Sequence, residues 1–205
     1  MIEQPPPAQA TLERIPVEDA EIYYLPKLPL AQSAQAVMNQ LIDEVPWRAE
    51  NIVVWGKTVR QPRLIAWYGD KEVHYTYSGI RHEPLPWTDG LIEIKSRVEE
   101  VAGTNFNSVL LNYYRHHRDS MGLHSDDEPE LGRRPIIASL SLGEERTFLF
   151  KHKTRKDVKG VRLKLASGSL LLMKGDTQHC WKHGIEKEKG PCGPRINLTF
   201  RRICT

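Results

Sequence analysis

The second half of the chain consists of short apolar runs that alternate with period two, and this pattern constrains the fold more than any other feature. The runs are rich in Val, Ile, Leu, Tyr and Phe, are separated by Gly, Ser, Asp or Pro, and cover residues 106–115, 134–143, 146–153, 160–175 and 194–203. Alternation at this spacing is typical of strands that bury one face. Several such strands in succession predict a sandwich or barrel.

Two helices are expected ahead of this β-rich half. In residues 30–45 the apolar side chains recur at helical spacing, and Pro46 ends the pattern. A second helix follows residues 86–89, with its apolar face formed by Leu91, Ile94, Val98 and Val101 and with Gly103 as its C-terminal cap. We therefore expect a mostly β, α+β protein: a jelly-roll barrel, or double-stranded β-helix, with an N-terminal helical buttress.

Composition places the chain among ordinary globular proteins. The 205 residues are 40% hydrophobic and 27% charged, which suits one domain. Residues 1–20 are rich in Pro, Gln and Ala and predict a flexible lead-in, so the domain is expected over 21–205. No apolar run suggests a membrane span or signal peptide, so the protein is expected in the cytoplasm, or in the nucleus of a eukaryote. We also expect it to be a monomer. The odd set Cys180, Cys192 and Cys204 contains no CxxC pair and indicates reduced thiols.

The last run carries a polar stripe. Ile196, Leu198 and Phe200 share one face of the predicted strand, and the other face carries Arg195, Asn197, Thr199 and Arg201. The two arginines lie roughly 20 Å apart along a strand, so one small ligand reaches both only if their side chains converge. A ligand with two carboxylates gives each guanidinium a partner. In residues 106–115, Asn112 and Tyr114 also share a face and are candidates to complete the pocket, with core packing as the alternative for Tyr114.

Residues 121–132 place one histidine among several carboxylates. His124 and Asp126, at i and i+2 in an extended segment, point to the same side. They supply two ligands of a 2-His-1-carboxylate triad, which binds Fe(II) and leaves coordination positions open. The third ligand is expected from a distant strand, where His179 and His183 are both candidates and spacing does not choose between them.

Three motifs together resemble the AlkB family of Fe(II)/2-oxoglutarate-dependent nucleic-acid dealkylating dioxygenases: H-x-D at 124–126, W-x-H-G at 181–184 and R-x-N-x-T-x-R at 195–201. The likeness covers about residues 20–203, and its detail at 124–132 and 135–143 is closer to the animal-type DNA-repair branch. The resemblance implies the cofactors Fe(II), 2-oxoglutarate and O2. It also implies oxidative demethylation of N1-methyladenine and N3-methylcytosine in DNA, with release of formaldehyde, succinate and CO2.

The resemblance also assigns residues to the metal and the cosubstrate. It makes His124, Asp126 and His183 the iron ligands, with His183 preferred because it holds the histidine position of the family's W-x-H segment. It implies that Arg201 and Tyr114 bind the distal carboxylate of 2-oxoglutarate. The end that chelates iron is then held by Arg195, Asn112 and Asn197.

Contacts with the nucleic acid are also implied. Glu128 is expected to contact the damaged base, whose positive charge a carboxylate favours, and Tyr75 and Tyr77 to stack on it. Asp127 is expected only to support the loop. A substrate-lid hairpin is expected at about residues 50–80. Trp55, beside Lys57, is expected there either as an aromatic wedge or as a side chain packed within the hairpin. The basic segment 151–164 holds seven Lys or Arg and one Asp, and its candidate phosphate contacts are Lys151, Lys153, Arg155 and Lys156.

Two alternatives remain open from the sequence. The same chemistry can act on RNA, a protein side chain or a small molecule instead of DNA. A different class of protein, a non-catalytic nucleic-acid-binding barrel, would use a structural zinc held by His179, Cys180, His183 and Cys192. That reading leaves Asp126 and the arginine-bearing strand without a role.

Overall fold

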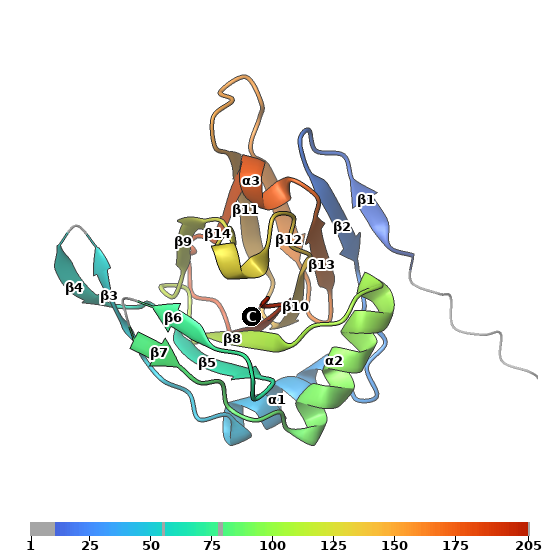
Figure 1. Cartoon of the computed structure of the whole chain (residues 1–205), viewed down its shortest axis with the longest axis vertical. Coiled ribbons are helices and arrows are strands. Elements are labelled where there is room, and N and C mark those ends of the chain that lie inside the picture. Colours follow the sequence, from blue (N-terminus) through green and yellow to red (C-terminus); the bar gives the residue numbers. More distant parts are fainter. Residues whose placement is uncertain (1–10, 55, 78–79, 205) are drawn as a thin grey trace, which may run out of the picture.

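The computed structural model describes residues 11–54, 56–77 and 80–204, with the side chains at 52–54, 57, 75–77 and 80–82 outside the description (Figure 1). Two antiparallel sheets pack face to face. The major sheet contains, in spatial order, β1 (Glu13–Ile15), β2 (Glu21–Leu25), β13 (Leu170–Lys174), β10 (Ile137–Gly143), β15 (Arg195–Arg201), β8 (Ser108–Tyr114) and β5 (Leu64–Gly69). The minor sheet contains β12 (Val161–Leu165), β11 (Arg146–His152), β14 (Trp181–Ile185) and β9 (Met121–His124). This arrangement confirms the predicted jelly-roll architecture.

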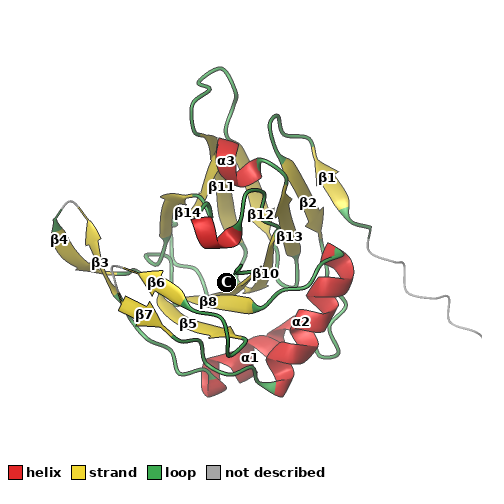
Figure 2. Cartoon of the chain, in the orientation of Figure 1, coloured by secondary structure: helices red, strands yellow, loops and turns green. Residues whose placement is uncertain are grey.

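Both predicted helices form and cover the outer face of the major sheet (Figure 2). Helix α1 (Ala34–Glu44) begins after Ser33, whose hydroxyl accepts a hydrogen bond from the Ala36 amide. Helix α2 (Asp89–Ala102) begins after Thr88 in the same way and ends at Gly103, whose φ of 68° is left-handed. The caps therefore fix both helices at the sheet, close to the predicted limits. Two short elements, η1 (Pro129–Leu131) and α3 (Thr177–Cys180), lie within the connections.

The alternation along β10 shows how the sheets divide the interior. Ala138, Leu140 and Leu142 pack outward against α1 and α2, in one hydrophobic cluster. Ile137 packs inward, against a second cluster that includes Phe148 and Trp181 of the minor sheet. Ser139 and Ser141 also point inward, where they meet polar side chains of β15. The space between the sheets is thus apolar in one part and polar in another.

The segment expected as a lead-in, residues 1–20, contains a strand. Residues 1–10 lie outside the described residues, but Glu13–Ile15 forms a strand that pairs with β2. The carbonyl of Glu18 accepts a hydrogen bond of 2.9 Å from the indole of Trp181. Low hydrophobicity did not prevent this order, because the edge of β2 offers backbone partners that the sequence does not show.

The predicted lid segment, about 50–80, is two hairpins rather than one. The pair β3 (Asn51–Val54) and β4 (Lys57–Arg60) forms the first, and β6 (Tyr75–Tyr77) and β7 (Ile80–His82) the second. Between them β5 belongs to the major sheet, where it pairs with β8. The β3–β4 hairpin projects from one side of the barrel (Figure 1).

Among the residues described, no helix combines the length and apolar character that a membrane crossing needs.

Candidate metal and cosubstrate site

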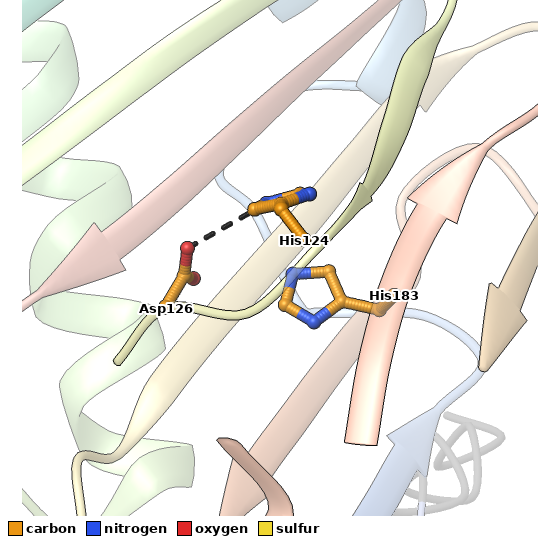
Figure 3. Close-up of side chains that lie close together, drawn as sticks. All are labelled: His124, Asp126 and His183. Atoms are coloured by element: carbon orange, nitrogen blue, oxygen red, sulfur yellow. Dashed lines mark ion pairs between the residues drawn. The ribbon is translucent and has the colours of Figure 1, made fainter. Parts of the chain in front are cut away.

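Three side chains of the predicted triad meet between the sheets. His124 ends β9, Asp126 follows it in the next loop, and His183 lies on β14 directly opposite His124. One ligand atom from each lies within 4.8 Å of the others (Figure 3). His124 Nε2 is 3.6 Å from Asp126 Oδ1, and the two imidazole centroids are 4.4 Å apart. Strand pairing therefore selects His183, the choice that spacing alone left open.

Two further residues hold Asp126 in place. Arg201 Nη2 donates to Asp126 Oδ1 at 2.9 Å, and the Asp126 amide donates to the side-chain oxygen of Gln178 at 2.9 Å. Burial alone would raise the pKa of the Asp126 carboxyl. The charge of Arg201 and the hydrogen bond it donates outweigh burial and leave this pKa at about 2. Asp126 is thus an anion at neutral pH, as a metal ligand must be.

His183 is buried and neutral. Burial lowers the pKa of its imidazole to about 3, because a charged ring loses its hydration between the sheets. Its ring stacks on Phe148 with centroids 5.3 Å apart and planes 16° apart. At neutral pH the ring therefore keeps the lone pair that a metal needs.

The polar stripe of β15 continues from this cluster. β15 lies between β10 and β8 and not at a sheet edge, so its polar face is enclosed. A pocket is lined there by Tyr114, Met121, His124, Asp126, Ser139, Phe148, Met173, His183, Gly184, Ile185, Arg195, Asn197, Thr199 and Arg201. All four stripe residues and all three triad residues share this one pocket, which places a cation site and an anion site side by side.

The two arginines of the stripe stand at different ends of the pocket. Arg201 contacts Asp126, whereas Arg195 lies opposite Tyr114 in the β8–β15 ladder. The Arg195 guanidinium is 5.2 Å from the centre of the Tyr114 ring and donates to Ser141 Oγ at 2.9 Å. The ladder does not favour the implied pairing of Arg201 with Tyr114, because Arg201 lies opposite Ser108 at the other end. Strand register, which the motif does not contain, decides this.

Comparison with known proteins agrees with this geometry. The family model described as "2OG-Fe(II) oxygenase superfamily" matches residues 21–201. The chain belongs to the 2OG-Fe(II) oxygenase superfamily.

Its relatives within this superfamily are AlkB homologues. It is 46% identical over 180 residues to alpha-ketoglutarate-dependent dioxygenase alkB homolog 3 of Homo sapiens, a match that covers 84% of this chain and 62% of that protein. It is 41% identical over 179 residues to DNA oxidative demethylase ALKBH2 of Mus musculus, covering 83% of this chain and 75% of that protein. The chain spans about three-fifths of the length of the alkB homolog 3 proteins it matches. The resemblance to the animal-type AlkB branch is confirmed.

A solved structure described as "The structure of OsALKBH1" shares the fold. Its TM-score is 0.62, and the match covers 94% of this chain and 100% of that chain. The identity is 16%, so this likeness bears on the fold alone.

The residues of this chain fit the two groups that the superfamily's name specifies. Asp126 Oδ2 is buried and makes no hydrogen bond to any described residue, as expected of an atom at a metal position. Arg195 Nε and Nη1 are also buried and make no hydrogen bond to any described residue. Burial is the main cause that lowers the pKa of the Arg195 guanidinium to about 10. A buried cation with unsatisfied donors requires an anion. Fe(II) fits the metal position beside Asp126, and a carboxylate of 2-oxoglutarate fits the unsatisfied donors of Arg195.

The implied amide contacts are only partly seen. Asn197 lines the pocket, and its side-chain nitrogen donates to Ser139 Oγ at 2.7 Å. Asn112 faces Asn197 in the ladder but is outside the lining, and its oxygen accepts a hydrogen bond of 2.8 Å from Arg63 Nε.

The expected nucleic-acid contacts are distributed unevenly. Trp55 lies outside the described residues, as do the side chains of Lys57, Tyr75 and Tyr77. Glu128 is half-buried, two residues after Asp126.

In the basic segment, Lys151 and Lys156 are exposed, while Lys153 binds Asp127 at 2.8 Å. This ion pair gives Asp127 its expected supporting role. Arg155 bonds to Glu18, Asp19 and Asp157, so the structure does not favour its predicted phosphate contact.

The zinc alternative is not supported. Within the described part of the chain, the group of side chains able to hold a metal contains His183. It does not contain the other three ligands of the zinc alternative, which are His179, Cys180 and Cys192. His179 instead contacts the carbonyl of Arg133 through its ring nitrogen.

Four supporting residues were missed from the sequence. Ser139 and Ser141 alternate with apolar residues, so the period of two that revealed the β15 stripe could have found them. Gln178 and Arg63 carry no such signal, because each acts through a contact between segments distant in sequence.

Gly184 is expected to control the position of His124. A β-bulge lies beside it, and a Cβ at Gly184 would be 2.8 Å from the Met121 carbonyl oxygen and 3.0 Å from that of Gly122. Gly184→Ala should push β9 away and weaken metal binding by roughly 10- to 100-fold. Gly122→Ala is the matched control, because a Cβ there meets nothing within 4 Å. Equal metal affinities of the two variants in calorimetric titrations would contradict this role.

Proposed function

We propose that this chain is an oxidative demethylase that removes methyl groups from N1-methyladenine and N3-methylcytosine in DNA, using Fe(II), 2-oxoglutarate and O2 and releasing formaldehyde, succinate and CO2. One observation carries the proposal: the His124, Asp126 and His183 cluster shares a pocket with the buried, unsatisfied guanidinium of Arg195. The names of the AlkB relatives support the substrate class.

The pocket gives each side chain a distinct task. His124, Asp126 and His183 hold the metal, and Arg201 keeps Asp126 oriented and ionised. Arg195 and Tyr114 bind the distal carboxylate of 2-oxoglutarate, with Ser141 fixing the guanidinium. Asn197 and Thr199 lie between the two ends, where Thr199 donates to the Asn197 side-chain oxygen at 2.8 Å.

Bound iron supplies the coupling of O2 reduction to oxidation of 2-oxoglutarate and of the N-methyl group. The chain contributes orientation and the exclusion of water. Phe148, Met173 and Ile185 line the apolar side of the pocket, so the reacting groups lie in a largely dry space.

Selection of damaged bases is assigned to Glu128. N1-methyladenine and N3-methylcytosine are cationic, and a half-buried carboxylate two residues after Asp126 is proposed to favour them over neutral bases. Flipping such a base from a duplex is also easier, since methylation has already broken its pairing. Exposed Lys151 and Lys156 are proposed to contact the phosphate backbone.

The test is incubation with Fe(II), ascorbate and 2-oxoglutarate of oligonucleotides that carry either lesion, in single- and double-stranded DNA and in RNA. Mass spectrometry should show loss of one CH2 unit that depends on 2-oxoglutarate. If succinate forms without demethylation, the metal and cosubstrate assignments stand and the proposed substrate is wrong. Faster reaction on RNA would favour the RNA alternative.

Glu128→Gln should lower demethylation more than it lowers succinate formed without substrate. The carboxylate is assigned to the base and not to the metal, so only the first reaction depends on its charge. The ratio of formaldehyde to succinate measures this separation. Parallel loss of both reactions would contradict the role in base recognition.

A further inference from the structure

A second buried arginine lies beside the cosubstrate end of the pocket. Arg146, on β11 of the minor sheet, is 0% exposed. Its Nη2 donates to the carbonyl oxygens of Asp119 and Glu186, and its Nε is 3.4 Å from a carboxylate oxygen of Glu188. One guanidinium therefore holds together the turn before β9 and the segment that follows β14.

The same guanidinium stands over the ring of Tyr114. Its central carbon is 5.9 Å from the ring centroid, and that of Arg195 is 5.2 Å from the same centroid. The two cations come from opposite sheets and meet at one aromatic side chain. Arg146 does not line the pocket itself, so it acts there through Tyr114 and through its charge.

This corner carries an excess of positive charge. Burial lowers the pKa of Arg195 to about 10, and the nearby charge of Arg146 lowers it in the same direction. Glu188, at 32% side-chain exposure, is the carboxylate recorded within ion-pair range of either guanidinium among the described residues. The two buried guanidiniums therefore face one partly exposed carboxylate at this corner. Arg146 Nη1 and Arg195 Nε and Nη1 also make no hydrogen bond to any described residue.

We propose that Arg146 is a positioning residue that makes the cosubstrate pocket selective for 2-oxo acids with a second carboxylate. It orients Tyr114 from the minor sheet and adds a second positive charge, which the distal carboxylate of 2-oxoglutarate neutralises. The inference rests on the proposed function, because it takes Arg195 and Tyr114 as the cosubstrate end. Glu188 offsets part of this charge and therefore weakens dicarboxylate binding.

The experiment compares two ligands that differ in one carboxylate. 2-Oxoglutarate and 2-oxopentanoate have the same carbon chain and the same chelating end, and only the first has the distal carboxylate. Binding of each to the Mn(II)-loaded protein is measured by calorimetry without turnover. Arg146→Met should weaken binding of 2-oxoglutarate by at least about tenfold and leave binding of 2-oxopentanoate within about twofold, since only the distal carboxylate lies beside the lost charge. Arg146→Lys should retain most of the difference in affinity between 2-oxoglutarate and 2-oxopentanoate.

Two further variants make the result decisive. Arg162→Met is the matched control: Arg162 lies on β12, is 64% exposed and pairs with Glu186, so neither ligand should respond. Glu188→Gln removes the counter-charge from a partly exposed site. It should therefore raise the affinity for 2-oxoglutarate relative to that for 2-oxopentanoate. This variant decides the proposal if Arg146→Met does not fold.

Each outcome has one meaning. Equal weakening of both ligands by Arg146→Met would show a purely structural role and overturn the proposal, as would an unchanged ligand ratio in Glu188→Gln. If the wild-type protein binds 2-oxoglutarate no better than 2-oxopentanoate, the proposed cosubstrate site itself fails, and the fault lies with the proposed function.

Discussion

Asp126→Ala should abolish metal-dependent turnover. The carboxylate is the anionic member of the triad, and it joins His124 and His183 to Arg201. Its loss removes one ligand and leaves a guanidinium beside two imidazoles without the charge that offset it. Metal affinity should fall by more than the roughly 10- to 100-fold typical of losing an outer partner of a metal ligand.

Asp127→Ala is the matched control, since it removes the adjacent carboxylate. Asp127 is exposed, and among the described residues it pairs with Lys153, a contact of the kind worth about 0 to 1 kcal/mol. Mn(II) titration and turnover should therefore stay close to wild type. Nucleic-acid binding by Asp126→Ala, measured by fluorescence anisotropy, should persist, because the proposed phosphate contacts, Lys151 and Lys156, do not belong to the triad. Retained turnover in Asp126→Ala would reject the triad.

Arg195→Met should have the second largest effect, which is to weaken the binding of 2-oxoglutarate. Arg195 is buried at 1% exposure, and two of its nitrogens are without a hydrogen bond to any described residue. Removing one partner of a buried charge pair costs about 2 to 5 kcal/mol, which is roughly 30-fold or more in Kd. KM for 2-oxoglutarate should rise accordingly, while Mn(II) affinity measured without cosubstrate should change little.

Arg201→Met separates the two ends of the pocket. Arg201 contacts Asp126, so its loss should disturb the metal as well as the cosubstrate. If Arg201→Met affected only 2-oxoglutarate and Arg195→Met weakened the metal, the assignment of the two arginines would have to be exchanged. Arg195→Lys keeps the charge and loses the fork of donors, so partial recovery there would show that charge is a separate contribution.

Much of the site could be predicted because its signals are local. Alternation along 195–201 separates an apolar face from a polar face, and the structure confirms that division between the hydrophobic cluster and the pocket. The spacing of His124 and Asp126 placed both on one side of an extended segment for the same reason. The helix limits also follow from local capping by Ser33, Thr88 and Gly103.

Other features depend on contacts that no local pattern contains. Spacing did not distinguish His183 from His179, and it is the pairing of β14 with β9 that places His183 opposite His124. Tyr114 meets Arg195 because of the β8–β15 register. Arg146 reads as an ordinary residue at the start of a β-run, yet it is fully buried between two loops. β5 lies inside the expected lid segment but completes the major sheet.

The sequence by itself determined which side chains share a face, which segments become strands and which chemistry the polar face can perform. Those properties follow from the backbone period of two and from side-chain chemistry, which act over a few residues. Only the tertiary structure decided which faces meet, which arginine stands at the metal and which at the far end of the pocket. The physical reason is that register is set by hydrogen bonds between strands far apart in the chain, and a shift of one residue turns every side chain to the other face.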